Sequence, residues 1–179
     1  IFANTLGMII FAVIFSNRTK EMKTTKERDK YLIELERKKQ ELKIARDIQR
    51  SFLPESTPRL EGIELSVSNL SAWEVGGDFY DFIPITKNKW GLVIADVSGK
   101  GIPAALFMAL SRTIIHASTV GKSTVANSIE QANKLIFENS KSGAFVTLFY
   151  GIIDSKKKTI KYVNAGHNPP LMLKSASKD

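Results

Sequence analysis

The sequence predicts an α+β fold with antiparallel sheet, and three observations support this prediction. Apolar, β-rich segments come in two pairs, within residues 79–95 and 145–163, and a short polar turn joins each pair. Two segments of helical periodicity, residues 102–118 and 123–139, lie between the pairs. The order of hairpin, two helices and hairpin favours antiparallel strands, because paired parallel strands would need a crossover connection between them.

Residues 1–17 begin the chain with an almost wholly apolar run, and Arg18 is the first charged residue. Because a membrane span needs roughly 20 apolar residues, we expect this run to be the C-terminal part of a transmembrane helix. A buried core helix is the alternative. Five basic residues follow between positions 18 and 28, and this flank predicts that the rest of the chain faces the cytoplasm.

Residues 18–53 are predicted to form a long linker helix. Residues 20–50 are highly charged and contain no Gly or Pro, which suits an uninterrupted helix. A narrow seam recurs at spacings of three, four or seven residues and predicts a parallel coiled-coil homodimer, with a solvated single helix as the alternative. The seam consists of Tyr31, Leu35, Leu42, Ala45, Gln49 and Phe52.

Pro54 and Pro58 end the helix, and we expect residues 54–179 to form a globular domain. Residues 63–70 alternate between apolar and polar and are expected to form a strand. The remaining elements are two strands at 79–85 and 90–95, two helices at 102–118 and 123–139, and two strands at 145–153 and 159–163.

The composition excludes several classes of function. The 179 residues include no Cys and only two His, so a disulfide framework, a Cys-ligated zinc and a three-His metal site are excluded. Metal chemistry would have to use carboxylates, which suit Mg²⁺ or Mn²⁺. The net charge of +8 arises mainly in residues 1–50, with 12 Lys and Arg against 7 Asp and Glu. We therefore predict no nucleic-acid partner for the globular part.

Two Asp-containing turns carry the clearest functional signal. Asp78 precedes the strand at 79–85, and Asp96 directly follows a buried apolar run, each beside glycines. If the two strands pair as a hairpin, the two carboxylates converge, and a bound cation would compensate for their charge. Asp81 is expected on the other face of its strand. The spacing alone leaves open a second interpretation, in which these Asp residues only shape turns.

The loop from Gly99 to Ala104 matches a loose dinucleotide-binding fingerprint between a strand and a helix. The acidic residue expected about 20 positions further on is missing, since the next one is Glu130. A nucleotide-binding enzyme is therefore a weaker hypothesis than a carboxylate-held metal.

Five ordered motifs between Ala45 and Leu173 resemble the SpoIIE-like branch of the PPM-type (type 2C) protein serine/threonine phosphatases. The motifs are Ala45-x-x-Ile48-Gln49 before Leu53-Pro54, Gly76-Gly77-Asp78-x-Tyr80-Asp81, Asp96-Val97-Ser98-Gly99-x-Gly101 before Ala104-Ala105-Leu106, Phe145-x-Thr147, and Asn164-Ala165-Gly166-His167-x-Pro169. The resemblance implies an α-β-β-α sandwich of two antiparallel sheets flanked by helices.

The resemblance also implies two Mn²⁺ or Mg²⁺ ions. Asp78 and Asp96 match the family's metal-binding aspartates, and the backbone carbonyl of Val97 is a further expected ligand. The implied nucleophile is a metal-bound water, so no catalytic side chain is predicted. Supporting roles fall to Asp81, Gly77, Gly99 and His167, with a purely structural role as the alternative for His167.

The implied function is a metal-dependent protein serine/threonine phosphatase in bacterial signal transduction, anchored at the cytoplasmic membrane with its phosphatase domain in the cytoplasm. Its implied substrate is a phosphorylated regulatory protein of the anti-sigma-factor-antagonist type. Nothing after His167 matches the family's later acidic motifs, so we expect an incomplete domain with little activity of its own. The alternative is a non-catalytic signalling or docking module that dimerises through the linker helix.

Overall fold

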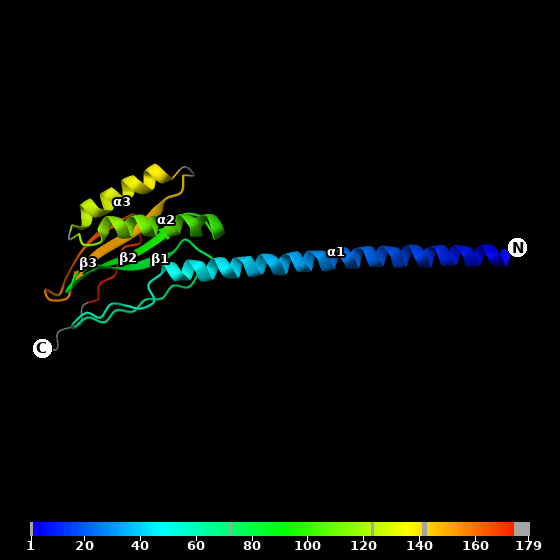
Figure 1. Ribbon diagram of the computed structural model, residues 1–179, viewed down its shortest axis with the longest axis horizontal. Helices are drawn as coiled ribbons and strands as arrows, with labels where there is room; N and C mark the ends of the chain where they lie inside the picture. Colours follow the sequence, from blue (N-terminus) through cyan, green and yellow to red (C-terminus); the bar gives the residue numbers. More distant parts are fainter. Residues whose placement is uncertain (1, 72, 123, 141–142, 174–179) are drawn as a thin grey trace. The chain divides into compact units, whose positions relative to one another are not determined.

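The computed structural model describes residues 2–71, 73–122, 124–140 and 143–173 (Figure 1). It divides into two compact units, Ile1–Ile44 and Ala45–Asp179. Helix α1, Phe2–Phe52, supplies the described part of the first unit and continues into the second. Each unit is described by itself below.

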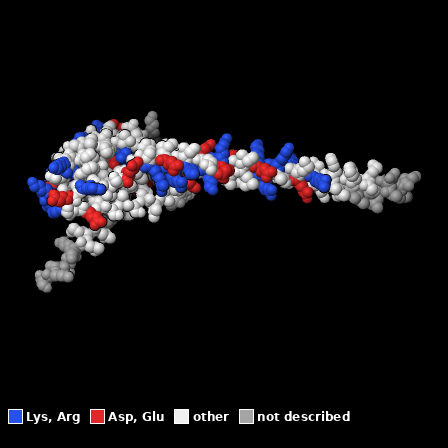
Figure 2. Space-filling model, turned by 60° about the horizontal axis from the view of Figure 1, so that its bottom comes forward, with Lys and Arg blue, Asp and Glu red and all other residues white. Residues whose placement is uncertain are grey.

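The first unit is a helix on which charges of both signs are interspersed from Arg18 onward (Figure 2). Lys38 pairs with Glu34 at 3.4 Å, and Arg37 pairs with Glu41 at 3.6 Å. These pairs join successive turns and are largely exposed, so each contributes only about 0.3–0.5 kcal/mol. Tyr31 is 65% exposed in this single chain, so the coiled-coil seam is open to a partner and dimerisation stays a prediction.

Within the described part of the chain, no helix has a stretch both long and apolar enough to cross a membrane. The transmembrane end predicted for residues 1–17 is therefore not supported. The physical reason is that polar Ser16 and Asn17 and the charged Arg18 follow Phe15 and interrupt the apolar run.

The second unit contains one four-stranded antiparallel sheet in the order β1-β2-β3-β4. Both predicted hairpins are present, and so is the predicted α+β class. The strands are β1 at Phe79–Thr86, β2 at Lys89–Val97, β3 at Val146–Asp154 and β4 at Thr159–Ala165.

Helices α2, Gly101–Thr119, and α3, Val125–Asn139, cover one face of this sheet (Figure 1). Alternate residues of the strands point into that layer, which is why burial along β1 alternates. The core between helices and sheet includes the fully buried Ile83, Met108 and Tyr150. Each such side chain contributes about 1.5–3 kcal/mol by leaving water.

Two predictions about the sheet were wrong. Residues 63–70 are not a strand, and only an isolated bridge between Leu60 and Ile63 lies nearby. Alternation of apolar and polar residues indicates extended backbone, whereas a strand also needs the hydrogen bonds of a neighbouring strand. The described residues also form one sheet rather than the two of the expected sandwich, because each strand pairs with the next along the chain.

Candidate functional site

Four polar side chains meet at one end of the sheet, one from each strand or the residues beside it. Asp78 precedes β1, and the pairing of Phe79 with Ala95 places it next to Asp96. Asp96 is in turn opposite Thr147 of β3. Oγ1 of Thr147 lies 2.9 Å from Nδ1 of His167, which follows β4. We call these four residues, Asp78, Asp96, Thr147 and His167, the polar row.

The carboxylates of Asp78 and Asp96 are close neighbours at this end of the sheet. The pKa of Asp78 is raised, first by partial loss of hydration and then by a hydrogen bond to, and the negative charge of, Asp96. The nearby His167 opposes this rise. Two carboxylates held together in this way repel each other when both are ionised. A cation bound between them would remove that repulsion.

Gly77 brings the Val97 carbonyl next to the polar row. A Cβ atom at Gly77 would stand 2.6 Å from the Val97 carbonyl oxygen and 3.0 Å from the Val97 Cβ. No real Cβ makes the first contact, so only glycine allows this approach. Gly99, with φ +99°, serves a different purpose, since it allows the turn from β2 into α2. The predicted ligands Asp78, Asp96 and Val97 are therefore close in space.

His167 is fixed by its own turn as well as by Thr147. Its backbone N–H donates to Oδ1 of Asn164 at 2.8 Å, and Nδ2 of Asn164 donates back to the His167 carbonyl at 2.9 Å. The reciprocal pair explains the spacing of the Asn-x-x-His motif. The ring thus reaches Thr147 from a rigid turn, and it lies near enough to Asp78 to influence its pKa.

Asp81 lies on the opposite face of β1, as the alternation of the strand predicts. Its carboxylate is 2% exposed and accepts from Nη2 of Arg112 at 3.0 Å and from the Phe82 N–H at 2.9 Å. Nδ1 of His116 lies 2.8 Å from its other oxygen. Arg112 and His116 are one turn apart on α2, so Asp81 fixes α2 against β1. The structure therefore does not bring Asp81 into the polar row.

Gln49, which the sequence placed in the coiled-coil seam and in a motif of the family, supports the site directly. Its side chain donates from Nε2 to the Gly76 carbonyl at 2.6 Å and accepts from the Gly76 N–H at 3.1 Å. The two bonds hold the backbone two residues before Asp78. A side chain of Asn69 adds a bond to the Asp78 carbonyl at 3.2 Å. The motif containing Gln49 was the signal that could have revealed this role.

The donor atoms fit part of a Mg²⁺ or Mn²⁺ site. Both ions prefer oxygen ligands, and Asp78, Asp96 and the Val97 carbonyl supply oxygen. Among the residues described, no three or more His, Cys, Asp or Glu side chains form a group that could hold a metal ion. The side-chain ligands available in this part of the chain are thus the two carboxylates.

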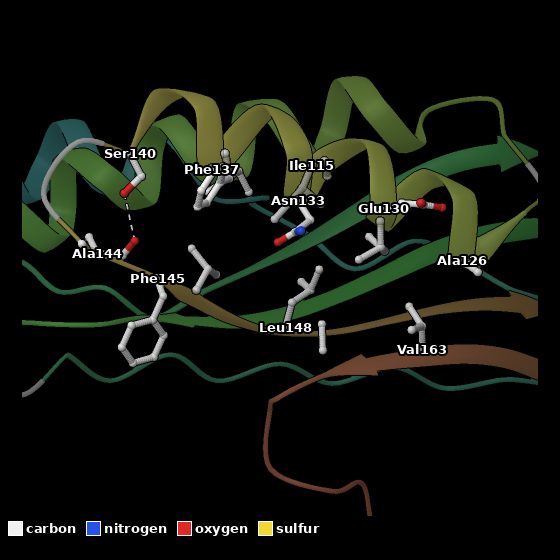
Figure 3. A pocket seen from close by; sticks show the side chains of 16 residues that line it. Ile115, Ala126, Glu130, Asn133, Phe137, Ser140, Ala144, Phe145, Leu148 and Val163 are labelled. Atoms are coloured by element: carbon white, nitrogen blue, oxygen red, sulfur yellow. Dashed lines mark hydrogen bonds between the residues drawn. The ribbon is translucent and has the colours of Figure 1, made fainter.

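An apolar cavity lies away from the polar row (Figure 3). Its volume is about 720 Å³, and it lies between α3 and the strands β3 and β4. Apolar side chains such as Ile129, Leu148 and Val163 dominate its lining. Glu130 and Asn133 also line it, but they are two polar residues in a mostly apolar wall. We therefore place the candidate chemistry at the polar row.

Comparison with known proteins places this arrangement in context. Residues 86–179 match the family described as Stage II sporulation protein E (SpoIIE). The chain is 32% identical over 139 residues to phosphoserine phosphatase RsbU of Bacillus subtilis, covering 73% of this chain and 39% of RsbU. It is 34% identical over 137 residues to phosphoserine phosphatase RsbP of the same organism, covering 74% and 34%.

A solved structure supports the fold. The SiaA-PP2C domain of Pseudomonas aeruginosa superposes with a TM-score of 0.57 at 18% identity, covering 72% of this chain and 53% of that one. At this identity the similarity concerns the fold alone. The chain spans 39% or less of the length of the curated relatives named above.

Proposed function

The chain belongs to the Stage II sporulation protein E (SpoIIE) family, and on that basis we propose that its protein removes phosphate from phosphoserine or phosphothreonine of a regulatory partner protein. The observation that carries the proposal is the convergence of Asp78 and Asp96 at one end of the sheet. The names of RsbU and RsbP, both phosphoserine phosphatases, support the same reaction class.

In this proposal, Asp78, Asp96 and the Val97 carbonyl hold Mn²⁺ or Mg²⁺. When bound, such ions lower the pKa of a water molecule so that it can attack phosphorus. Gly77 permits the close approach of the Val97 carbonyl, and Gln49 holds the backbone that leads to Asp78. His167 and Thr147 complete the polar row and restrict the positions that the substrate can take.

We propose a phosphorylated protein of the anti-sigma-factor-antagonist type as the substrate, within bacterial signalling. We also propose a homodimer formed through the seam of α1. The apolar side chains of that seam support this part, since Tyr31 and Leu35 are 65% and 51% exposed in the single chain. Paired helices would bury these side chains.

The test is Mn²⁺-dependent release of phosphate from a phosphoserine protein by the full-length protein. The Asp78→Asn and Asp96→Asn double variant should lose this activity, and Asp29→Asn, which changes an exposed aspartate of α1, should keep it. Normal turnover by the double variant would refute the mechanism. Calorimetric titration with Mn²⁺ separates this proposal from a non-catalytic docking module, which has no need of metal.

A further inference from the structure

A second cavity opens beside Asp78, and the reaction proposed above does not use it. It lies between the last turns of α1 and residues 69–71 and 73–76, with Asp78 in its lining. Its volume is about 170 Å³. Cofactor and drug pockets typically have about 300–1,000 Å³, so this hollow suits individual side chains better than a cofactor.

The walls of the hollow are held together without a ligand. Gln49 of α1 makes its two bonds to Gly76, and Asn69 bonds to the Asp78 carbonyl. Three hydrogen bonds thus connect the helix, the extended segment and the start of β1. A preformed surface loses little conformational entropy when it binds, which favours affinity.

Two arginines line the hollow on the α1 side. Nε of Arg46 is buried, and within the described part of the chain it has no hydrogen-bond acceptor. The carboxylate of Asp47 is 3.8 Å from it, beyond hydrogen-bond distance. Arg50 is one turn further along and is exposed. Guanidinium groups bind carboxylates and phosphates with paired hydrogen bonds, so these two residues offer a site for an anion.

The opposite wall offers apolar contact. Trp73 is 60% exposed, and Leu70 beside it is 89% exposed. Trp and Arg are the residue types most enriched among those that dominate protein interfaces. Glu74 also lines the hollow, but it does not remove the preference of the two arginines for an acidic group over a lysine.

We propose that this hollow binds the peptide segment that flanks the phosphorylated residue of the partner protein. Arg46 and Arg50 bind a carboxylate of that segment, and Trp73 packs against an apolar side chain. Because Asp78 lines both the hollow and the polar row, a bound segment would present its phosphorylated residue to the metal site. The proposal rests on the proposed function for the phosphorylated residue, but the binding itself needs no turnover.

The experiment measures binding of two fluorescent peptides to the full-length protein with Mn²⁺ present. Both peptides carry the non-hydrolysable phosphonomethyl analogue of phosphoserine followed by Leu. One has Asp and Glu around it, and the other has Lys at the same positions. We expect the acidic peptide to bind about 10-fold more tightly, because one partly desolvated ion pair contributes about this gain in affinity.

The double variant Arg46→Gln, Arg50→Gln should lose this preference, and Trp73→Ala should weaken both peptides equally. Arg59→Gln is the matched control, since Arg59 is an exposed arginine of the same unit that does not line the hollow. Thermal melts show that each variant is folded. Equal affinity of the two peptides for the unaltered protein, or a preference that survives in the double variant, would overturn the proposal.

The outcome is independent of catalysis. If phosphate release from phosphoserine fails while the acidic preference and its loss in the arginine variant are found, the hollow is supported and the proposed function is not. If phosphate is released but the two peptides bind alike, the hollow is refuted and the proposed function remains.

Discussion

Asp78 and Asp81 are three residues apart, yet their surroundings are opposite. Asp81 is 2% exposed and is matched by Arg112, by His116 and by a backbone N–H. Asp78 is exposed and has another carboxylate as its neighbour. Removing one partner of a buried ion pair leaves an uncompensated charge and costs stability, whereas two like charges held together repel each other. The contrast is the one expected if Asp81 holds the fold together and Asp78 binds the metal ion proposed above.

Asp154, the last residue of β3, extends the comparison to the other end of the sheet. Its pKa is lowered, first by a hydrogen bond from the Lys157 N–H and also by the Lys89 charge and the Lys156 N–H. The pKa of Asp78 is raised. The same amino acid thus has opposite shifts at the two ends of one sheet. Local N–H donors explain the first shift, whereas loss of hydration and the neighbouring Asp96 carboxylate explain the second.

The largest expected effect comes from Asp81→Asn. The change removes the charge that Arg112 and His116 face, and breaking one side of a buried ion pair typically costs 3–5 kcal/mol. Since Arg112 and His116 are partly exposed, we expect a loss of about 3 kcal/mol in the free energy of unfolding. Urea unfolding measures it, and Asp29→Asn on the exposed helix should change stability by less than about 0.5 kcal/mol.

A loss below about 1 kcal/mol in Asp81→Asn would mean that α2 is held by apolar packing alone. In that case the contrast between Asp81 and Asp78 would be one of exposure and not of function.

Gly77→Ala comes next in size. The added Cβ would meet the Val97 carbonyl oxygen at 2.6 Å, so the backbone at the polar row has to move. Overpacking of this kind typically costs 1–3 kcal/mol, and we also expect Mn²⁺ affinity to fall at least about 10-fold. Calorimetry measures the affinity. Gly7→Ala is the control, because no atom lies within 4 Å of a Cβ there. Unchanged Mn²⁺ affinity in Gly77→Ala would remove the Val97 carbonyl from the proposed ligands.

Asp154→Asn should have a smaller effect that depends on pH. The folded-state pKa of Asp154 lies below its ordinary value of 3.8. The ionised carboxylate therefore stabilises the fold above that value, and the contribution disappears as the pH falls through the folded pKa. The melting temperature of the variant should be lower at pH 7, and the difference from the unaltered protein should shrink toward pH 3. A difference that is constant with pH would assign the effect to geometry and not to charge.

The sequence was sufficient to predict the elements whose signal is local. Apolar, β-rich segments joined by short polar turns predicted both hairpins. The position of Asp81 three residues after Asp78 predicted that the two would face opposite sides. The convergence of Asp78 and Asp96 followed from the hairpin, because the end of β2 lies beside the start of β1. These inferences need only the period of a strand and the direction of pairing.

What could not be predicted depends on contacts distant in sequence. The bond between Gln49 and Gly76 joins residues 27 positions apart, and nothing in the spacing of α1 indicates that its end packs on a loop. Residues 63–70 have the alternating pattern of a strand. A strand also needs a neighbouring strand to bond with, and the described structure forms no such pairing here. The number of sheets likewise depends on which strands find each other, and all four described strands joined one sheet.

The smallest and most diagnostic effect is that of Asp78→Asn, because its sign should depend on metal. Without metal, the ionised Asp78 carboxylate is disfavoured in the folded state, as its raised pKa indicates. Asn removes the repulsion with Asp96. In EDTA the free energy of unfolding of the variant should therefore equal that of the unaltered protein or exceed it by less than about 1 kcal/mol. With excess Mn²⁺ the order should reverse, because binding stabilises only the protein that has both carboxylates. Thermal melts in EDTA and in Mn²⁺ measure both signs. If Asp78→Asn instead destabilises the protein in EDTA, Asp78 belongs with Asp81 and Asp154 among the aspartates that hold the fold together, and the metal site would have to lie elsewhere.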